Sequence, residues 1–192
     1  MSDSAATLNQ AIALMEESGD PASASVVCRQ ILARDLNFLP AWIVLAAALL
    51  AAGQTAAALA AADAALALAP ASTPALFIRG TALNLLRRPE EAAAALARAS
   101  ENAPNHAGAW LNLGIALTAL DRHEEAEAAI RRALALNPDA APAWASLGAL
   151  LVQALRIAEA LAAYDNSVRL DPEAAAFRHD RALTHLRAGN FA

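Results

Sequence analysis

The chain has 192 residues, with 14 Lys and Arg residues against 19 Asp and Glu residues, and its formal net charge is −5. This balance disfavours nucleic acid as a partner, because a nucleic-acid site needs a basic face that displaces phosphate counterions. The hydrophobic fraction of 58% is inflated by alanine, which buries little area per residue, so it does not imply a large core. Abundant Ala and Arg without any Lys is typical of a protein from a GC-rich bacterial genome.

Cysteine content and the N-terminus bear on the compartment. Cys28 is the only cysteine, which excludes a disulfide within the chain and fits a reducing cytoplasm. Residues 1–4 do not start a basic segment followed by an apolar one, so we find no signal peptide. The most apolar stretch, 41–52, is shorter than the ~20 residues that a membrane span needs. We therefore predict a cytoplasmic protein without membrane insertion.

An internal period of 34 residues organises the chain. It is marked by Pro70, Pro104, Pro138 and Pro172, and by Trp42, Leu76, Trp110 and Trp144 ahead of them. A fixed period of this length indicates an array of small supersecondary units. The repeats are 5–38, 39–72, 73–106, 107–140 and 141–174, followed by a partial repeat, 175–192.

The first two repeats are the least regular. Repeat 5–38 has Leu36 where the later repeats have proline. Repeat 39–72 opens with residues 41–52, which predict a helix that is apolar on nearly every side. Such a helix should be covered all round, so stacking against neighbours leaves one face for something else to cover.

The later repeats each predict a helix, a turn and a second helix. In repeat 141–174 the first helix is marked by apolar and small residues at positions i, i+3, i+4 and i+7, from Trp144 to Leu151. A second helix begins near Ile157 and ends before Pro172, since proline disfavours a helical residue ahead of it. We expect Gly80, Gly114 and Gly148 on the first helices to face Ala92, Ala126 and Ala160 on the second helices.

The pattern resembles the tetratricopeptide repeat, W-x2-L-G-x2-Y followed by A-x3-F, A and P. In the fifth repeat it is present as Trp144, Leu147, Gly148, Leu151, Ala160, Tyr164, Ser167 and Pro172. The resemblance implies an all-α solenoid of antiparallel helix pairs, wound as a right-handed superhelix, with five repeats and a C-terminal capping helix. It also implies that 1–192 forms a single array.

The resemblance further implies that the first helices line a concave groove that binds a peptide or protein segment. The predicted groove residues are Ile43, Val44, Ala47, Phe77, Ile78, Thr81, Leu111, Asn112, Ile115, Ser146 and Val152. Spacing alone leaves a second interpretation open, in which Ile43, Val44 and Ile78 are packed against neighbouring repeats.

Two uses of this family can be weighed against the same positions. A clamp for a C-terminal carboxylate needs lysine, arginine and asparagine, but this chain has Val44, Ala47 and Ile78 there and no lysine. An asparagine ladder needs asparagine at the sixth position of each repeat, and only Asn112 provides it. Neither use is supported by these residues.

A second hypothesis follows from the partial sixth repeat, which stops at Ala192. The chain would then be the N-terminal recruiting or dimerising arm of a larger enzyme, such as a bacterial O-GlcNAc-transferase-like glycosyltransferase. The incomplete repeat would also expose a stacking face through which the chain could form a homo-oligomer.

The sequence predicts no catalytic residue, no metal site and no cofactor. His179 and His185 are six residues apart and so lie on different faces of a helix, which is unsuitable for a shared metal ion. A glycine-rich phosphate loop and a nucleophile–base pair are both absent. We therefore expect a non-catalytic interaction module.

Overall fold

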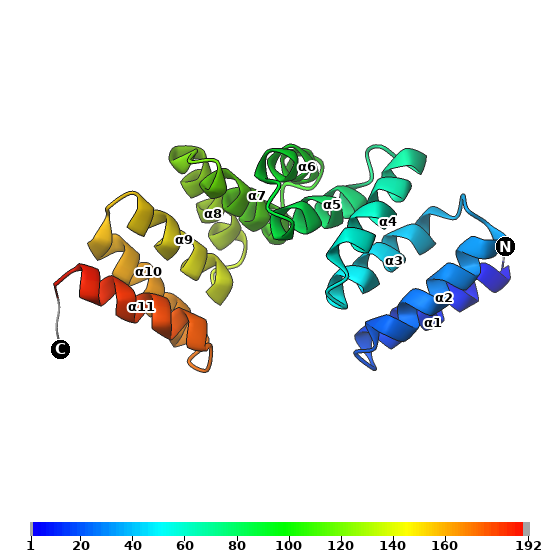
Figure 1. The fold of residues 1–192 in the computed structure, drawn as a ribbon, viewed down its shortest axis with the longest axis horizontal. Coiled ribbons are helices and arrows are strands. Elements are labelled where there is room, and N and C mark those ends of the chain that lie inside the picture. Colours follow the sequence, from blue (N-terminus) through cyan, green and yellow to red (C-terminus); the bar gives the residue numbers. More distant parts are fainter. Residues whose placement is uncertain (1, 190–192) are drawn as a thin grey trace. The chain divides into compact units, whose positions relative to one another are not determined.

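The computed structural model describes residues 2–189, with side chains from Ser4 onward, and this part of the chain is entirely helical apart from its loops (Figure 1). The helices are α1 (Ser2–Glu16), α2 (Pro21–Arg34), α3 (Leu39–Ala51), α4 (Thr55–Leu68), α5 (Thr73–Leu85), α6 (Pro89–Asn102), α7 (Ala107–Ala119), α8 (His123–Leu136), α9 (Ala141–Gln153), α10 (Ile157–Leu170) and α11 (Ala175–Arg187). The expected all-α fold of helix pairs is confirmed. Asn190, Phe191 and Ala192, where the sixth repeat breaks off, lie outside the described residues.

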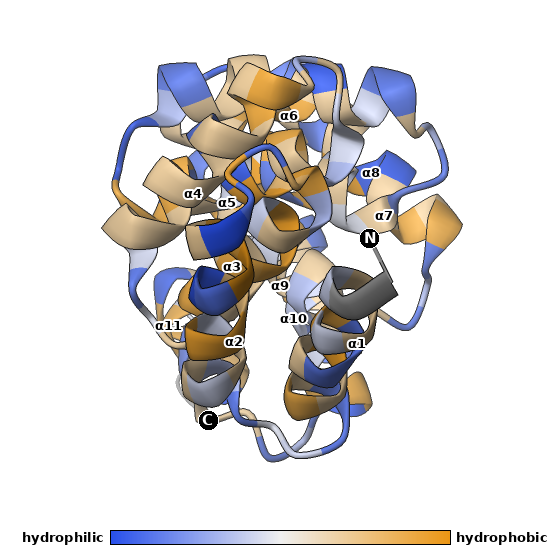
Figure 2. Ribbon diagram, turned by 90° about the vertical axis from the view of Figure 1, so that its right-hand side faces the viewer, coloured by the Kyte–Doolittle hydropathy of each residue, from blue (hydrophilic) through white to orange (hydrophobic). Residues whose placement is uncertain are grey.

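The chain divides into two compact units, Met1–Asn102 with helices α1 to α6 and Ala103–Ala192 with helices α7 to α11. Within each unit consecutive helices run antiparallel (Figure 1). The helices carry both hydrophobic and hydrophilic segments, and several connecting loops are hydrophilic (Figure 2). Among the described residues, no helix is both long and apolar enough to cross a membrane.

The helices of the N-terminal unit form two layers. The first helices of neighbouring repeats touch, α1 against α3 and α3 against α5, whereas the second helices α2, α4 and α6 contact only first helices in the described part of the chain. One layer is therefore closely packed and the other is splayed. This difference curves the N-terminal unit, with its first helices on the inner side.

The C-terminal unit repeats this arrangement. Helix α9 contacts both α7 and α11, while α8 and α10 pack against first helices only, within the described residues. The largest fully buried side chains include Leu150 and Leu151 of α9 and Ile130 of α8. The first helices α7, α9 and α11 thus form the inner layer of this unit.

Each repeat proline follows a helix end by two residues. Helices α4, α6, α8 and α10 end at Leu68, Asn102, Leu136 and Leu170, ahead of Pro70, Pro104, Pro138 and Pro172. Proline restricts the residue before it to extended backbone, so the helix cannot continue through that residue. The period in the sequence is therefore a period of helix termination.

The turn after each first helix depends on a residue with left-handed backbone. These residues are Gly19, Gly53, Arg87, Asp121, Leu155 and Gly189, with φ between 57° and 75°. They stand 34 residues apart, so the turn recurs with the repeat. Glycine adopts this conformation without strain, whereas Arg87, Asp121 and Leu155 hold it against the repulsion between Cβ and backbone.

The atoms nearest to the glycines of the first helices belong mainly to bulky side chains, which the sequence did not predict. A Cβ atom on Gly80 would collide with Leu96, one on Gly114 with Ile130, and one on Gly148 with the ring of Tyr164. At Gly114 the expected alanine also lies close, because the backbone oxygen of Ala126 would be 3.2 Å from the added Cβ atom. The second helix thus inserts a large side chain into a gap on the first helix.

Tryptophan at the fourth position of a repeat fixes the preceding linker. The indole Nε1–H of Trp42 donates to the Leu36 carbonyl at 2.8 Å, that of Trp110 to the Pro104 carbonyl at 3.0 Å, and that of Trp144 to the Pro138 carbonyl at 2.8 Å. The third repeat has Leu76 instead, and there the Pro70 carbonyl accepts from Arg98 Nη2 at 2.8 Å. The linker carbonyl is therefore bonded in each of these four repeats.

Candidate functional site

The inner layer of the N-terminal unit carries an apolar surface on two adjacent helices, α3 and α5. Ile43, Val44 and Ala47 of α3 and Phe77 of α5 pack against the core while remaining partly exposed. Helix α3 contains no charged residue. We call these four residues, with Thr81 of α5, the α3–α5 surface.

Ile78 and Thr81, two further predicted groove residues of α5, differ in their exposure. Ile78 is only 6% exposed and belongs to the core, so we leave it out of the α3–α5 surface. Thr81 is half-buried, and its hydroxyl donates to the Phe77 carbonyl at 2.9 Å within the helix. The second interpretation, in which Ile43 and Val44 pack against neighbouring repeats, is correct in part. Both side chains pack against the core, but both also remain partly exposed.

The charged residue of α5 is placed beside this apolar surface. Arg79 Nε donates to Asp63 Oδ1 of α4 at 2.7 Å, and its Nη2 lies 3.7 Å from Glu91 Oε2 of α6. Its charge is thus directed toward the second helices. The arrangement keeps α5 apolar where it adjoins α3.

The remaining predicted groove residues lie in the C-terminal unit. Leu111 and Asn112 of α7 are half-buried, and Ile115 of the same helix is 39% exposed. Ser146 and Val152 are half-buried on α9. The Ser146 hydroxyl donates to the Pro142 carbonyl at 2.9 Å, which reduces its capacity to bind a ligand.

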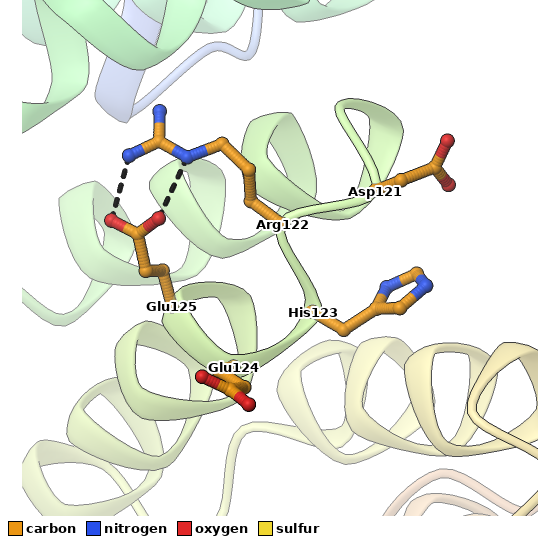
Figure 3. A pocket seen from close by; sticks show the side chains of 5 residues that line it. All are labelled: Asp121, Arg122, His123, Glu124 and Glu125. Carbon is orange, nitrogen blue, oxygen red and sulfur yellow. Dashed lines mark hydrogen bonds and ion pairs between the residues drawn. The ribbon is translucent and has the colours of Figure 1, made fainter.

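A shallow cavity lies at the turn between α7 and α8, lined by Asp121, Arg122, His123, Glu124 and Glu125 (Figure 3). Arg122 donates two hydrogen bonds, of 2.8 and 2.6 Å, to the Glu125 carboxylate. These bonds hold the pKa of the Glu125 carboxyl below its usual range. Asp121 and His123 point away from this pair (Figure 3). Because the five side chains do not converge, the cavity provides no common site for a ligand.

The same ion pair recurs at the start of other second helices. Arg88 pairs with Glu91 at 2.7 Å and Arg156 with Glu159 at 2.6 Å, in each case three residues apart. Arg156 also reaches Glu127 of α8 at 2.7 Å. Repetition of the pair in three successive repeats identifies it as part of the turn structure.

A second cleft lies between α9 and α11 on the inner side of the C-terminal unit, and its volume is about 290 Å³. It is lined by Ala149, Val152, Gln153, Tyr164, Asp180, Leu183, Thr184 and Arg187. Three of these residues, Ala149, Val152 and Gln153, are at groove positions that the repeat pattern predicts. Tyr164 also stands out in the sequence as a polar member of the cleft. The equivalent residues of the earlier repeats are Cys28, Ala62, Leu96 and Ile130, which lack a hydroxyl group.

Metal and thiol chemistry receive no support from the described side chains. Residues 4–189 contain no group of three His, Cys, Asp or Glu side chains placed to hold a metal ion. Cys28 is fully buried, and burial raises the pKa of its thiol to about 11. A thiol that stays protonated is a poor nucleophile.

Comparison with protein families identifies the repeat. A family model described as tetratricopeptide repeat matches residues 43–105 and 146–192, and a second model with the same description matches residues 85–151. The first of these matches alone covers more than half of the chain. No curated protein matches the sequence.

Solved structures share the fold at low sequence identity. PilW, described as a type IV pilus biogenesis factor, is 23% identical with a TM-score of 0.88, over 100% of this chain and 88% of that chain. TTC0263, a protein of Thermus thermophilus, is 24% identical with a TM-score of 0.73, over 95% and 99%. YrrB is 20% identical with a TM-score of 0.73, over 92% and 90%, and is described as having an unusual peptide-binding site.

Proposed function

Because this chain belongs to the tetratricopeptide repeat family, we propose that it is a non-catalytic scaffold that holds a segment of another protein on its α3–α5 surface. The observation that carries the proposal is the partial exposure of Ile43, Val44 and Phe77 on two adjacent, inner-layer helices. Contiguous apolar side chains at a surface are typical of interaction sites.

The partner segment should present apolar side chains to this surface. Helix α3 has no charge, and the Arg79 side chain is drawn away by Asp63 and Glu91, so the surface lacks groups that would select a charged ligand. Phe77 is the largest side chain on it, and an aromatic residue at the centre of an interface commonly contributes most of the binding free energy. Phe77 is therefore the expected anchor.

Support also comes from the family and from one structural neighbour. Tetratricopeptide repeat folds generally bind proteins or peptides, and the neighbour YrrB is described as having a peptide-binding site. A second neighbour is a chain of the APC/C hetero-tetramer Cut9–Hcn1; it is 20% identical with a TM-score of 0.84, over 96% of this chain and 37% of that chain. These likenesses favour a partner protein over a small-molecule substrate.

The test begins with a ligand selected on the full chain from a displayed library of random dodecapeptides. Binding of the selected peptide is then measured by calorimetry for the wild type and for Phe77→Ala. We expect Phe77→Ala to weaken binding about fivefold or more, which corresponds to a loss of about 1 kcal/mol or more.

Matched controls come from exposed apolar residues on the second helices. Val26 of α2 is 52% exposed and Leu68 of α4 is 40% exposed, so Val26→Ala and Leu68→Ala remove similar surface away from the α3–α5 surface. Both variants should bind like the wild type. Equal binding by Phe77→Ala, with the fold retained by circular dichroism, would overturn the proposal.

A further inference from the structure

The side chains of the α3–α5 surface offer a bound segment few hydrogen-bonding partners. Trp42 has the only polar side-chain atom of α3, and its indole Nε1–H donates to the Leu36 carbonyl at 2.8 Å. The backbone N–H and C=O groups within the helix bond to one another. A segment that lies on α3 therefore contacts methyl and methylene groups.

The polar side chains at the centre of α5 are engaged as well. Residues 75–83 include two of them, Arg79 and Thr81. Arg79 Nε donates to Asp63 Oδ1 of α4 at 2.7 Å, and the Thr81 hydroxyl donates to the Phe77 carbonyl at 2.9 Å. Both side chains are therefore committed to bonds within the protein.

This shortage of partners selects the backbone conformation of a bound segment. An extended segment does not pair its own N–H and C=O groups, and laying it on the surface removes water from some of them. Each buried polar group that is left without a partner costs about 1–3 kcal/mol. A helical segment pairs these groups internally, between residues i and i−4, so it brings only side chains to the surface.

The exposed residues of α3 also match a helix in length. Ile43, Ala47 and Leu50 follow one another at i, i+4 and i+7 and are half-buried, so they form a stripe of about 10 Å along the helix axis. Ala47 and its equivalent on α5, Thr81, are small residues on two helices that contact each other. Small side chains at these positions allow another helix to approach closely.

We propose that the α3–α5 surface binds its partner segment as an amphipathic α-helix, which lays its apolar side chains over Phe77 and Ala47. The charged side chains of this helix would point to solvent, because the surface has no group to pair with them. Recognition then depends on apolar residues spaced at i, i+3, i+4 and i+7. This inference rests on the proposed function, since it specifies the conformation of the segment bound at the same surface.

Two designed peptides of identical composition test the proposal. Each has 14 residues, with four Leu and with Ala, Glu and Lys at the other positions, and each carries acetyl and amide end groups. The leucines stand at positions 4, 7, 8 and 11 in the helix-period peptide and at positions 4, 6, 8 and 10 in the alternating peptide. We expect calorimetry on the full chain to give the helix-period peptide a Kd at least about fivefold lower.

The conformation of the bound peptide is read by NMR. A ¹³C label at the Cα atom of a central alanine in the helix-period peptide should move toward the helical chemical shift as the protein is added. Phe77→Ala should weaken this binding, which assigns the helix to the α3–α5 surface. Thr81→Val keeps the size of the side chain but removes the hydroxyl, and it should bind within about twofold of the wild type.

The proposal is overturned if the alternating peptide binds as tightly, if the label moves toward the extended chemical shift, or if neither peptide binds at about 1 mM. Equal binding by Phe77→Ala would place the helix elsewhere and would also overturn it. Weaker binding by Thr81→Val would mean that the hydroxyl serves the ligand, which contradicts the argument. The proposed function is tested separately, by the effect of Phe77→Ala on the selected dodecapeptide.

Discussion

A side chain at residue 148 would collide with Tyr164, because a Cβ atom on Gly148 would lie 2.9 Å from three carbons of the ring. Glycine within a helix normally costs about 0.5–1 kcal/mol relative to alanine. Its presence in α9 is explained by the ring, which fills the space that a side chain would need. The contact joins the two helices of one repeat.

Gly148→Ala should therefore destabilise the protein, although the same change raises helix propensity. We expect a loss of about 1–3 kcal/mol from overpacking, measured by urea unfolding monitored by circular dichroism. Alanine has a higher helix propensity than glycine, and this gain offsets part of the overpacking cost. The measured loss of stability is therefore smaller than the overpacking cost alone.

The matched control removes the ring. Repeat 39–72 has alanine at both equivalent positions, Ala46 and Ala62, which shows that a small pair is compatible with the repeat. Gly148→Ala in a Tyr164→Ala background should be neutral or stabilising. Equal destabilisation in both backgrounds would mean that the cost does not come from the ring.

Leu155→Gly should stabilise the protein. Leu155 has φ 60° and is 83% exposed, so it carries left-handed strain without contributing packing. A non-glycine residue in this conformation costs about 1–2 kcal/mol, of which the extra chain entropy of glycine offsets about 0.5–1 kcal/mol. We expect a net gain of about 0.5–1 kcal/mol in the free energy of unfolding.

Leu155→Ala provides the control, because it removes the exposed apolar side chain but keeps the strained backbone. It should change the free energy of unfolding by less than about 0.5 kcal/mol. If Leu155→Ala stabilised as much as Leu155→Gly, the exposed side chain and not the backbone would be responsible.

Acid should weaken the turns that begin the second helices. Hydrogen bonds from Arg88, Arg122 and Arg156 lower the pKa values of Glu91, Glu125 and Glu159. A carboxyl group with a lowered folded-state pKa stabilises the protein above its unfolded-state pKa, here near 4.5. This stability is lost as the pH falls through the folded-state values, so Tm should decline below about pH 4.5.

The contribution of each pair can be separated by substitution. Glu125→Gln keeps the shape of the side chain and removes its titration, so the variant should show a shallower fall of Tm with acid than the wild type. Because these pairs are exposed, 1 M salt should reduce the difference between the two proteins. An unchanged acid profile would assign the pH dependence to other carboxyl groups.

Alkali should act through two buried groups. Burial raises the pKa of Tyr164 to about 12 and that of the Cys28 thiol to about 11. The folded state holds these protons more tightly than the unfolded chain does. The contribution of the two groups to the free energy of unfolding is therefore fully present below about pH 9, and it falls as the pH rises toward 12. Near-ultraviolet absorbance of tyrosinate should therefore appear late and together with unfolding.

Cys28→Ala with Tyr164→Phe removes both groups and should flatten the stability profile between about pH 9 and 12. If native Tyr164 instead ionised near its ordinary pKa with the helices intact, its hydroxyl would be in contact with solvent.

Periodicity predicted the helices well because each boundary has a local cause. The prolines end α4, α6, α8 and α10, and the apolar spacing defines which face each helix buries. That the whole of 1–192 forms a single right-handed array stays a prediction, as do self-association and the hypothesis of a larger enzyme. These depend on contacts that no spacing within one repeat determines.

The candidate sites were predicted less completely, for two physical reasons. Spacing along α5 places Phe77 and Ile78 next to each other, but their exposure depends on the neighbouring helices, and only Ile78 joins the core. The gap at Gly148 was visible in the sequence, yet the side chain that fills it comes from sixteen residues away. Pairing across helices has no signature in the period of either helix.

The Trp110 bond to the linker has a consequence for how such a chain can be rebuilt. Its acceptor is a backbone carbonyl, and Trp42 makes the same bond to Leu36 that Trp110 makes to Pro104. This bond therefore does not depend on which residue ends the preceding repeat. The glycine–ring fit, in contrast, is complete within a single repeat. Recombination of repeats at the linkers would preserve both contacts. A crossover between the two helices of one repeat would instead pair the glycine position of the first helix with a side chain of a different size on the second helix.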